Sequence, residues 1–344
     1  MTEIIGQHEI GKGVSRDHLI KLANNPKTKV IQFSSQLSSN EFDLLEKIVF
    51  SKRPDILLRI YGHYNEECNL TLIERIPSLR KISADNLMKA KGIEVVSKLE
   101  NLEILGIGVN NLENFDFIED INSELKELSI HKTKSKKPRI NSISRFEKLE
   151  FLYLDGQQKG INSLNQLKNL KRIVLRSVST KDLNFLSDLI KLWSVDIKLG
   201  GVKNFDALET LENLKFLELW QIRGLNDLSF ISKLNSLQNL FVQSLKQLSK
   251  FPNLNNLKKL RRIYLEDLKE LKDLSSITLA PSLEEFIYIS AQNLTPQDLI
   301  SVLKNTNLKS ILCGFGSEKK NNEFNLLAKE FGKKEYRYTK FEYN

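Results

Sequence analysis

The stretch Leu214-Lys-Phe-Leu-Glu-Leu219 decides the fold, because the same arrangement of apolar and polar residues recurs along most of the chain. Neighbouring side chains of a β-strand point to opposite faces, so Leu217 and Leu219 are predicted to face a core. The residues between and beside them face the other way. The preceding copy begins at Leu192 and the following one at Leu237.

The copies share the frame Leu-x-x-Leu-x-Leu, in which Ile, Val or Phe replaces some leucines. Their central residues are Ile82, Leu105, Leu128, Leu152, Ile173, Val195, Leu217, Leu240, Ile263, Phe286 and Ile311. A weaker copy begins at Leu57, and residues 30–33 are a degenerate first strand. The period of about 21–25 residues is that of leucine-rich repeats. One short strand cannot bury its apolar row alone, so the copies must stack side by side.

We therefore predict an α/β fold, a leucine-rich-repeat solenoid with a curved parallel sheet on the concave face and short helices on the convex face. The segments that return the chain between strands show helical apolar spacing, as in residues 185–189 and 208–211. Asp182, Asn204 and Asn226 precede such segments and are candidate caps for helices of two or three turns.

Over about residues 50–315 the pattern resembles the short, internalin-like class of bacterial leucine-rich repeats. That class has Asn four residues after the central Leu, where its side chain bonds neighbouring turns. Asn65 and Asn110 fit this position, but the later repeats carry Val178, Gly200, Ile222, Leu245 and Leu268. We therefore expect apolar packing to hold those turns. The resemblance implies the fold and no specific partner.

The ends of the chain differ from the repeats, as solenoid ends must to protect an open core. We predict an N-terminal capping region over residues 1–50, leucine-rich repeats over 51–315 and a C-terminal cap over 316–344. Helices are expected at 15–25 and 39–51 around strand 30–33, and at 322–331 near the other end. A further helix should begin at Thr295 and Pro296. The tail, residues 335–343, alternates like a strand and should pair with the last sheet edge.

The amino-acid composition, with 40% hydrophobic and 28% charged residues, is typical of a folded protein. The two cysteines lie far apart in sequence, which indicates neither a disulfide framework nor a metal cluster. The first residues lack the apolar run of a signal peptide, and no stretch is long enough to span a membrane. We therefore expect a cytoplasmic protein. The net charge of +9 is interpreted as a solvated surface; a footprint for a polyanion, with residues 132–139 as its densest basic block, is the alternative.

We find no catalytic constellation and expect neither enzymatic activity nor a cofactor or metal. Four histidines, His8, His18, His63 and His131, are scattered. Three Gly-x-Gly pairs, which begin at Gly11, Gly106 and Gly314, do not open long helices and are interpreted as turns or strand ends. Cys313 occupies an inward frame position, where a small core residue is expected.

The outward frame positions carry large aromatic and basic residues where a water-facing sheet needs only polar ones. Trp, Tyr and Arg dominate binding hot spots. The predicted partner-binding residues are Tyr61, Phe151, Tyr153, Arg172, Arg176, Phe216, Glu218, Trp220, Phe241, Arg262 and Tyr264. The alternative is that the rings pack on one another merely to stiffen the sheet. Asp155, Asp196, Glu266 and Glu285 share this face and would repel phosphate, so a protein partner fits better than nucleic acid.

The sequence thus favours a non-enzymatic protein-binding scaffold. Its concrete role would be that of an immunity protein that neutralises a toxin. Its Lys-, Asn- and Ile-rich composition suggests an AT-rich bacterial genome. Two alternatives stay open: an effector that binds a host protein through the same face, and a nucleic-acid-binding solenoid, which only the net charge favours. The identity of the partner and the oligomeric state are not encoded in the pattern.

Overall fold

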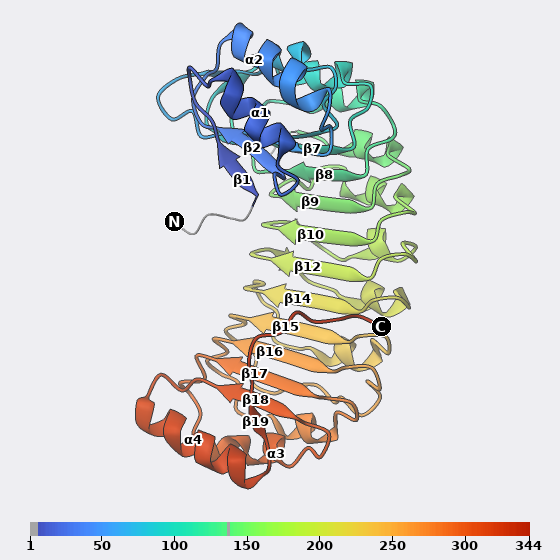
Figure 1. The fold of residues 1–344 in the computed structure, drawn as a ribbon. Helices are drawn as coiled ribbons and strands as arrows, with labels where there is room; N and C mark the ends of the chain where they lie inside the picture. The colour runs from blue at the N-terminus through green and yellow to red at the C-terminus, as the bar shows by residue number, and fades with distance from the viewer. Residues whose placement is uncertain (1–5, 136–137) are drawn as a thin grey trace. The chain divides into compact units, whose positions relative to one another are not determined.

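The computed structural model describes residues 6–135 and 138–344 and divides into two compact units, Met1–Leu170 and Lys171–Asn344. Each unit is built around parallel strands laid side by side in chain order (Figure 1). The predicted leucine-rich-repeat solenoid is confirmed.

In unit 1 the sheet begins with strands that precede the clear repeats. Its order is β1 (Gln7–Glu9), β2 (Val30–Phe33), β3 (Leu57–Tyr61), β5 (Lys81–Leu87), β7 (Ile104–Val109), β8 (Glu127–Ile130) and β9 (Phe151–Asp155). The expected strand at 30–33 is present, whereas β1, which pairs with β2, was not predicted. With three residues and no apolar alternation, β1 gives no periodic signal.

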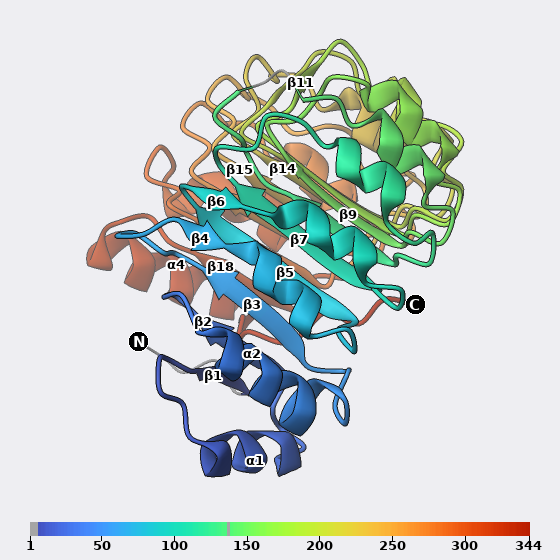
Figure 2. The same cartoon turned by 90° about the horizontal axis from the view of Figure 1, so that it is seen from above.

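The two helices predicted near the N-terminus, at 15–25 and 39–51, are present in the structure. Helix α1 (Arg16–Asn24) starts after Ser15, whose side chain accepts from the backbone N–H of His18. Helix α2 (Ser39–Leu45) starts with a capping box between Ser38 and Glu41 and continues as a π-helical turn over Glu46–Phe50. Both helices lie at the end of the sheet that carries β1 and β2 (Figure 2).

In unit 2 the frame residues fall into one register. The order is β10 (Arg172–Arg176), β12 (Ser194–Lys198), β14 (Phe216–Trp220), β15 (Asn239–Gln243), β16 (Arg262–Glu266), β17 (Glu285–Ile289), β18 (Ser310–Cys313) and β19 (Lys334–Glu335). Leu217 pairs with Val195 on one side and Leu240 on the other. All three are fully buried, as the frame predicts.

The return segments are shorter and tighter than expected. In place of helices of two or three turns they form 3-10 helices: Leu70–Arg75, Ile93–Lys98, Asp116–Asp120, Asn141–Arg145 and Ile161–Gln166 in unit 1, and Asn184–Leu186, Asp206–Thr210, Ser229–Lys233, Ser275–Leu279 and Pro296–Leu299 in unit 2. A repeat of about 21–25 residues leaves too little chain for α-helical turns after its strand and two connections. Two-stranded pairs, β4 (Cys68–Asn69) with β6 (Ala90–Lys91) and β11 (Ser179–Thr180) with β13 (Gly201–Val202), brace some connections.

The capping residues are partly those predicted. Asp182 accepts from the backbone N–H of Asn184 at 3.1 Å, and Asn204 accepts from that of Asp206 at 2.8 Å. In the next repeat Asp227, not Asn226, accepts from Ser229. The Asn226 prediction was therefore one residue out, because the short side chain must stand two residues before the amide that it caps.

The turns after the strands of unit 2 replace the missing Asn side chains in two ways. Val178, Ile222, Leu245 and Leu268 are buried, as expected for apolar packing. The residue before each of these is left-handed, with φ between 48° and 54°. Its amide donates to the carbonyl of the last residue of the next strand, for example Gln221 to Gln243 at 2.9 Å. A ladder of main-chain hydrogen bonds thus links successive turns.

The C-terminal cap follows the prediction only in part. Helix α3 (Ile300–Leu303) follows the capping box of Thr295 and Asp298. Helix α4 (Glu318–Glu330) starts earlier than expected, at Glu318, with Ser317 as its N-cap. Only Lys334 and Glu335 pair with β18 as β19. The Tyr336 amide still donates to the Ile311 carbonyl of β18, and beyond it the chain leaves the sheet edge and crosses the strands towards β15 (Figure 1). The prediction of an edge strand over 335–343 was therefore wrong beyond its first residue. Within the described ranges, no helix is long and apolar enough to cross a membrane.

Candidate protein-binding face

The outward residues of the strands form one face in each unit, which we call the open face. In unit 1 it carries Arg59, Ser83 and Tyr153; in unit 2 it carries Asp196, Glu218, Phe241 and Tyr264. Strand pairing places Asp196, Glu218, Phe241 and Tyr264 opposite one another in successive strands. The alternation that was predicted from the frame is therefore present.

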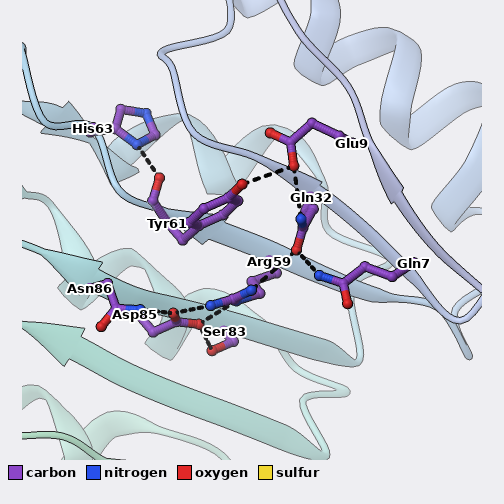
Figure 3. A network of polar contacts seen from close by, with 9 residues as sticks. All are labelled: Gln7, Glu9, Gln32, Arg59, Tyr61, His63, Ser83, Asp85 and Asn86. Atoms are coloured by element: carbon purple, nitrogen blue, oxygen red, sulfur yellow. Dashed lines mark hydrogen bonds and ion pairs between the residues drawn. The ribbon is translucent and has the colours of Figure 1, made fainter. Parts of the chain in front are cut away.

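At the N-terminal end of unit 1 the side chains of the open face form a network of polar contacts with one another (Figure 3). Arg59 donates twice to Asp85, at 2.8 and 2.7 Å, and its guanidinium lies 4.6 Å from the ring centroid of Tyr61. The Tyr61 hydroxyl donates to Glu9 at 3.0 Å. Burial, followed by the bond to Glu9, raises the pKa of Tyr61. The predicted contact residue Tyr61 thus has its polar end already engaged within the chain.

Asp85 is the centre of that network. Burial alone would raise its pKa, but the hydrogen bonds from Arg59 and Ser83 hold the pKa of this carboxyl below its usual range. Gly106 and Gly108, interpreted from sequence as turn or strand-end residues, lie inside β7. A Cβ atom at Gly108 would lie 2.8 Å from the Asp85 Cα. These glycines therefore allow Ser83 and Asp85 to lie close over the neighbouring strand.

Phe151 and Tyr153 lie on the open face of β9, at the other end of unit 1, and both are half-buried. The Tyr153 ring packs against His131 with centroids 5.0 Å apart. The pair covers part of this face with aromatic surface, as the frame predicts.

Unit 2 brings four of the predicted aromatic residues onto three neighbouring strands. Phe216 and Trp220 lie on β14, Phe241 on β15 and Tyr264 on β16, and all are half-buried. Phe241 and Tyr264 stack with centroids 4.7 Å apart and an interplanar angle of 21°. The Arg176 guanidinium lies 5.9 Å from the Trp220 ring. The rings therefore contact their neighbours and still present area to solvent.

A charged cluster lies between these rings and β10. The Lys198 Nζ is 2.9 Å from a Glu218 carboxylate oxygen and 3.5 Å from one of Asp196. Burial and the adjacent Glu218 carboxylate raise the pKa of Asp196 to about 6. The predicted contact Glu218 is thus held in place by Lys198, and the face carries both signs of charge.

Arg172 and Arg262 differ, although both were predicted as contact residues. Arg172 is exposed, 5.9 Å from the Trp193 ring. Arg262 is only 8% exposed, because it pairs with Glu285 and donates at 3.1 Å to both the carbonyl and the hydroxyl of Thr339 in the tail. In this conformation Arg262 binds the tail and is not presented to a partner.

Sequence reasoning missed a second row of residues on unit 2, one position before the outward residues. This row comprises Trp193, Lys215, Gln238 and Arg261, and the tail contacts all four. One sequence signal marks it: Trp193 is one of two tryptophans and stands where the neighbouring repeats carry Lys215, Gln238 and Arg261. Contact with the tail explains why Gln238 and Asn239 are buried polar residues.

The two cysteines have the environment of core residues. Cys68 is 1% exposed and Cys313 is 4% exposed. Burial raises the pKa of Cys68 to about 12 and raises that of Cys313 as well. The reactive thiolate form is therefore suppressed at neutral pH. Across residues 6–135 and 138–344 no three His, Cys, Asp or Glu residues are grouped as a metal site.

Comparisons with known proteins agree with the fold. No family model matches the sequence, and no curated protein matches it either. Among solved structures, internalin InlF from Listeria monocytogenes is 18% identical, with a TM-score of 0.60 over 89% of this chain and 86% of that one. The functional domain of InlJ from the same organism is 17% identical, with a TM-score of 0.52 over 86% and 64%. These likenesses confirm the internalin-like resemblance at the level of the fold.

Proposed function

We propose that this leucine-rich-repeat chain is a non-enzymatic scaffold that binds another protein through the open face of its sheet. The observation that carries the proposal is the cluster of Phe216, Trp220, Phe241 and Tyr264 on β14, β15 and β16. Partly exposed aromatic rings on a sheet face are the kind of anchor that dominates protein interfaces.

The charges beside the rings favour a protein over a nucleic acid. Lys198 is paired with Glu218, and Asp196 lies on the same face. Each carboxylate would repel a phosphate backbone, whereas a folded protein can offer complementary groups of both signs. The nucleic-acid alternative is based on the net charge of +9 alone. The densest basic block, residues 132–139, includes residues 136–137, which lie outside the described residues.

The alternative is that the same rings pack on one another and stiffen the sheet without binding a partner. The Phe241–Tyr264 stack fits it, because each ring covers part of the other. Trp220 supports the binding interpretation, because its ring lies 5.9 Å from the Arg176 guanidinium and Trp with Arg is a typical hot-spot pair.

The test is a binding measurement on Trp220→Ala. A pull-down with the purified chain, followed by mass spectrometry, identifies the partner, and calorimetry then compares variants. Loss of the indole should weaken binding by about 2 kcal/mol or more. Ile190→Ala, which alters an exposed apolar residue of a return segment, is the matched control and should bind like the parent. Normal binding by Trp220→Ala would exclude this face as the site.

The more specific role that we propose is that of an immunity-type protein, whose partner is a toxin. Its test follows from the identified partner: cells that express the partner alone should stop growing, and co-expression of this chain should restore growth. Trp220→Ala should fail to restore it. A partner that comes from a host cell, and that is harmless to the producing cell, would instead favour the effector alternative.

A further inference from the structure

The tail, residues 336–344, lies on unit 2 and contacts residues at the starts of several strands, among them Trp193, Gln238 and Arg261. Its Tyr336 amide donates to Ile311 of β18 at 3.0 Å. At the other end its contacts reach Trp193, which directly precedes β12. The segment therefore crosses strands at their N-terminal ends and occupies one margin of the open face.

Gln238 recognises the main chain of the tail. Its side-chain oxygen accepts from the main-chain N–H of Asn344 at 3.0 Å, and its side-chain nitrogen donates to the main-chain oxygen of Asn344 at 3.1 Å. The Lys215 Nζ donates to the same oxygen at 2.6 Å. Because these contacts are made to the main chain, they do not select a side chain at this position.

Alternate side chains of the tail supply the selective contacts. The Phe341 ring centroid is 4.7 Å from the Arg261 guanidinium and 5.0 Å from that of Arg262. The Tyr343 ring packs on Trp193, with centroids 5.1 Å apart, and its hydroxyl accepts from Asn239 at 3.3 Å. Two aromatic residues separated by one residue therefore match the spacing of this surface.

The tail is held without entering the core. None of its residues is buried, and Tyr338 is 85% exposed. In the described part of the chain, Tyr336 is the one tail residue with a main-chain hydrogen bond to another main chain. By contrast, Gln238 and Arg262, 3% and 8% exposed, are polar residues of the receiving surface. Departure of the tail would therefore leave the leucine core intact and uncover an assembled set of donors and rings.

We propose that Trp193, Lys215, Gln238 and Arg261 form a docking site for an extended peptide of a partner protein that carries an aromatic-x-aromatic motif, and that the tail occupies this site in cis. This inference rests on the proposed function, since it adds a peptide-binding margin to the same face. The partner peptide must displace the tail, so the tail acts as an intramolecular competitor.

The experiment uses a fluorescent peptide with the tail sequence, Tyr-Arg-Tyr-Thr-Lys-Phe-Glu-Tyr-Asn, and fluorescence anisotropy. Its binding to the full-length chain is compared with binding to the full-length variant Phe341→Ala, Tyr343→Ala. A tethered segment competes at an effective concentration of roughly millimolar. The variant, whose own tail has lost both rings, should therefore bind the peptide at least ten times more tightly than the parent chain.

Three controls make the result specific. A peptide with Ala at both motif positions should bind the tail variant at least ten times more weakly than the original peptide does. Adding Trp193→Ala and Gln238→Ala to the tail variant should abolish binding of the original peptide, whereas adding Leu326→Ala, at an exposed position of α4, should leave it unchanged. Circular dichroism and thermal melts should show that each chain is folded, as expected for residues outside the leucine core.

Equal affinity of the peptide for both chains, or binding that survives Trp193→Ala with Gln238→Ala, would overturn the proposal. A concentration-dependent dimer of the parent chain by light scattering, lost in Phe341→Ala, Tyr343→Ala, would mean that a second copy supplies the segment in trans and would also overturn it. Failure of the proposed function looks different: partner binding would then be insensitive to Trp220→Ala, while the peptide result would stand.

Discussion

At the residue scale, the protonation of Asp196 on the open face makes the stability of the protein depend on pH. It lies on β12 beside Glu218 and Lys198, with its side chain 13% exposed. Its pKa of about 6 lies above its ordinary value of 3.8, first because of burial and then because of Glu218. The native chain therefore holds a proton at this site between about pH 4 and 6 that the unfolded chain releases. Above pH 6 the buried charge lowers stability.

Asp196→Asn should accordingly stabilise the protein at pH 7.5, by roughly 3 kcal/mol at most, because a neutral amide replaces a buried carboxylate. The gain should shrink as the pH falls from 6 towards 4, where the native carboxyl is already protonated. Thermal melts of variant and parent at pH 7.5 and 4.5 measure the difference. A lower melting temperature of the variant at pH 7.5 would mean that the attraction of Lys198 outweighs the effect of burial.

At the scale of the element, the turn after each strand of unit 2 depends on close main-chain approach. Gly200 follows the left-handed Leu199, and a Cβ atom there would lie 2.2 Å from the Val178 carbonyl oxygen in the preceding turn. That oxygen also accepts from the Gly201 amide at 3.2 Å. The position is therefore restricted to glycine by the neighbouring backbone, which cannot rotate away as a side chain can.

Gly200→Ala should cost about 2 kcal/mol or more, because the turn must shift and lose its hydrogen bonds. Gly314→Ala is the matched control: it also follows a strand of unit 2, but its Cβ atom would meet only the Ser290 amide, at 3.8 Å. Urea titrations of both variants provide the comparison. Equal stabilities would show that the turn adapts and that the ladder contributes little.

At the scale of the whole molecule, each repeat contacts its neighbours, so damage should spread along a unit. Leu217 is fully buried on β14, and a charge there has no partner. The buried thiols report on this process, because Cys68 lies in unit 1 and Cys313 in unit 2.

Leu217→Asp should increase the labelling of Cys313 by an uncharged thiol reagent at least tenfold, with a smaller increase at Cys68. Mass spectrometry resolves the two sites, and Leu326→Asp on the exposed side of α4 is the control. Parental labelling rates at both cysteines in Leu217→Asp would contradict the predicted core register.

The open face illustrates how far periodicity determines a binding surface. The frame predicted that Phe216, Trp220, Phe241 and Tyr264 face away from the leucine core, and the structure places them there. Ile287 pairs with Tyr264 and so occupies an outward position of the frame, yet it is only 1% exposed on β17. A residue's face follows from the pattern, but what covers that face does not.

The sequence by itself determined the strands of the repeats, their parallel order, the buried rows and the helices at the N-terminal end. Those features depend on alternation, repeat length and capping residues such as Ser15 and Ser38, all of which act over a few residues. Only the tertiary structure decided the path of the tail and the burial of Arg262. The contact between Gln238 and Asn344 joins residues 106 positions apart, and its partners are chosen by the shape and charge of an assembled surface. An alternating pattern in the tail encodes an extended chain, and the same extended chain can pair with a sheet edge or cross the strands. The guanidiniums of Arg261 and Arg262 and the Trp193 ring, gathered by stacking of the repeats, stabilise the second path.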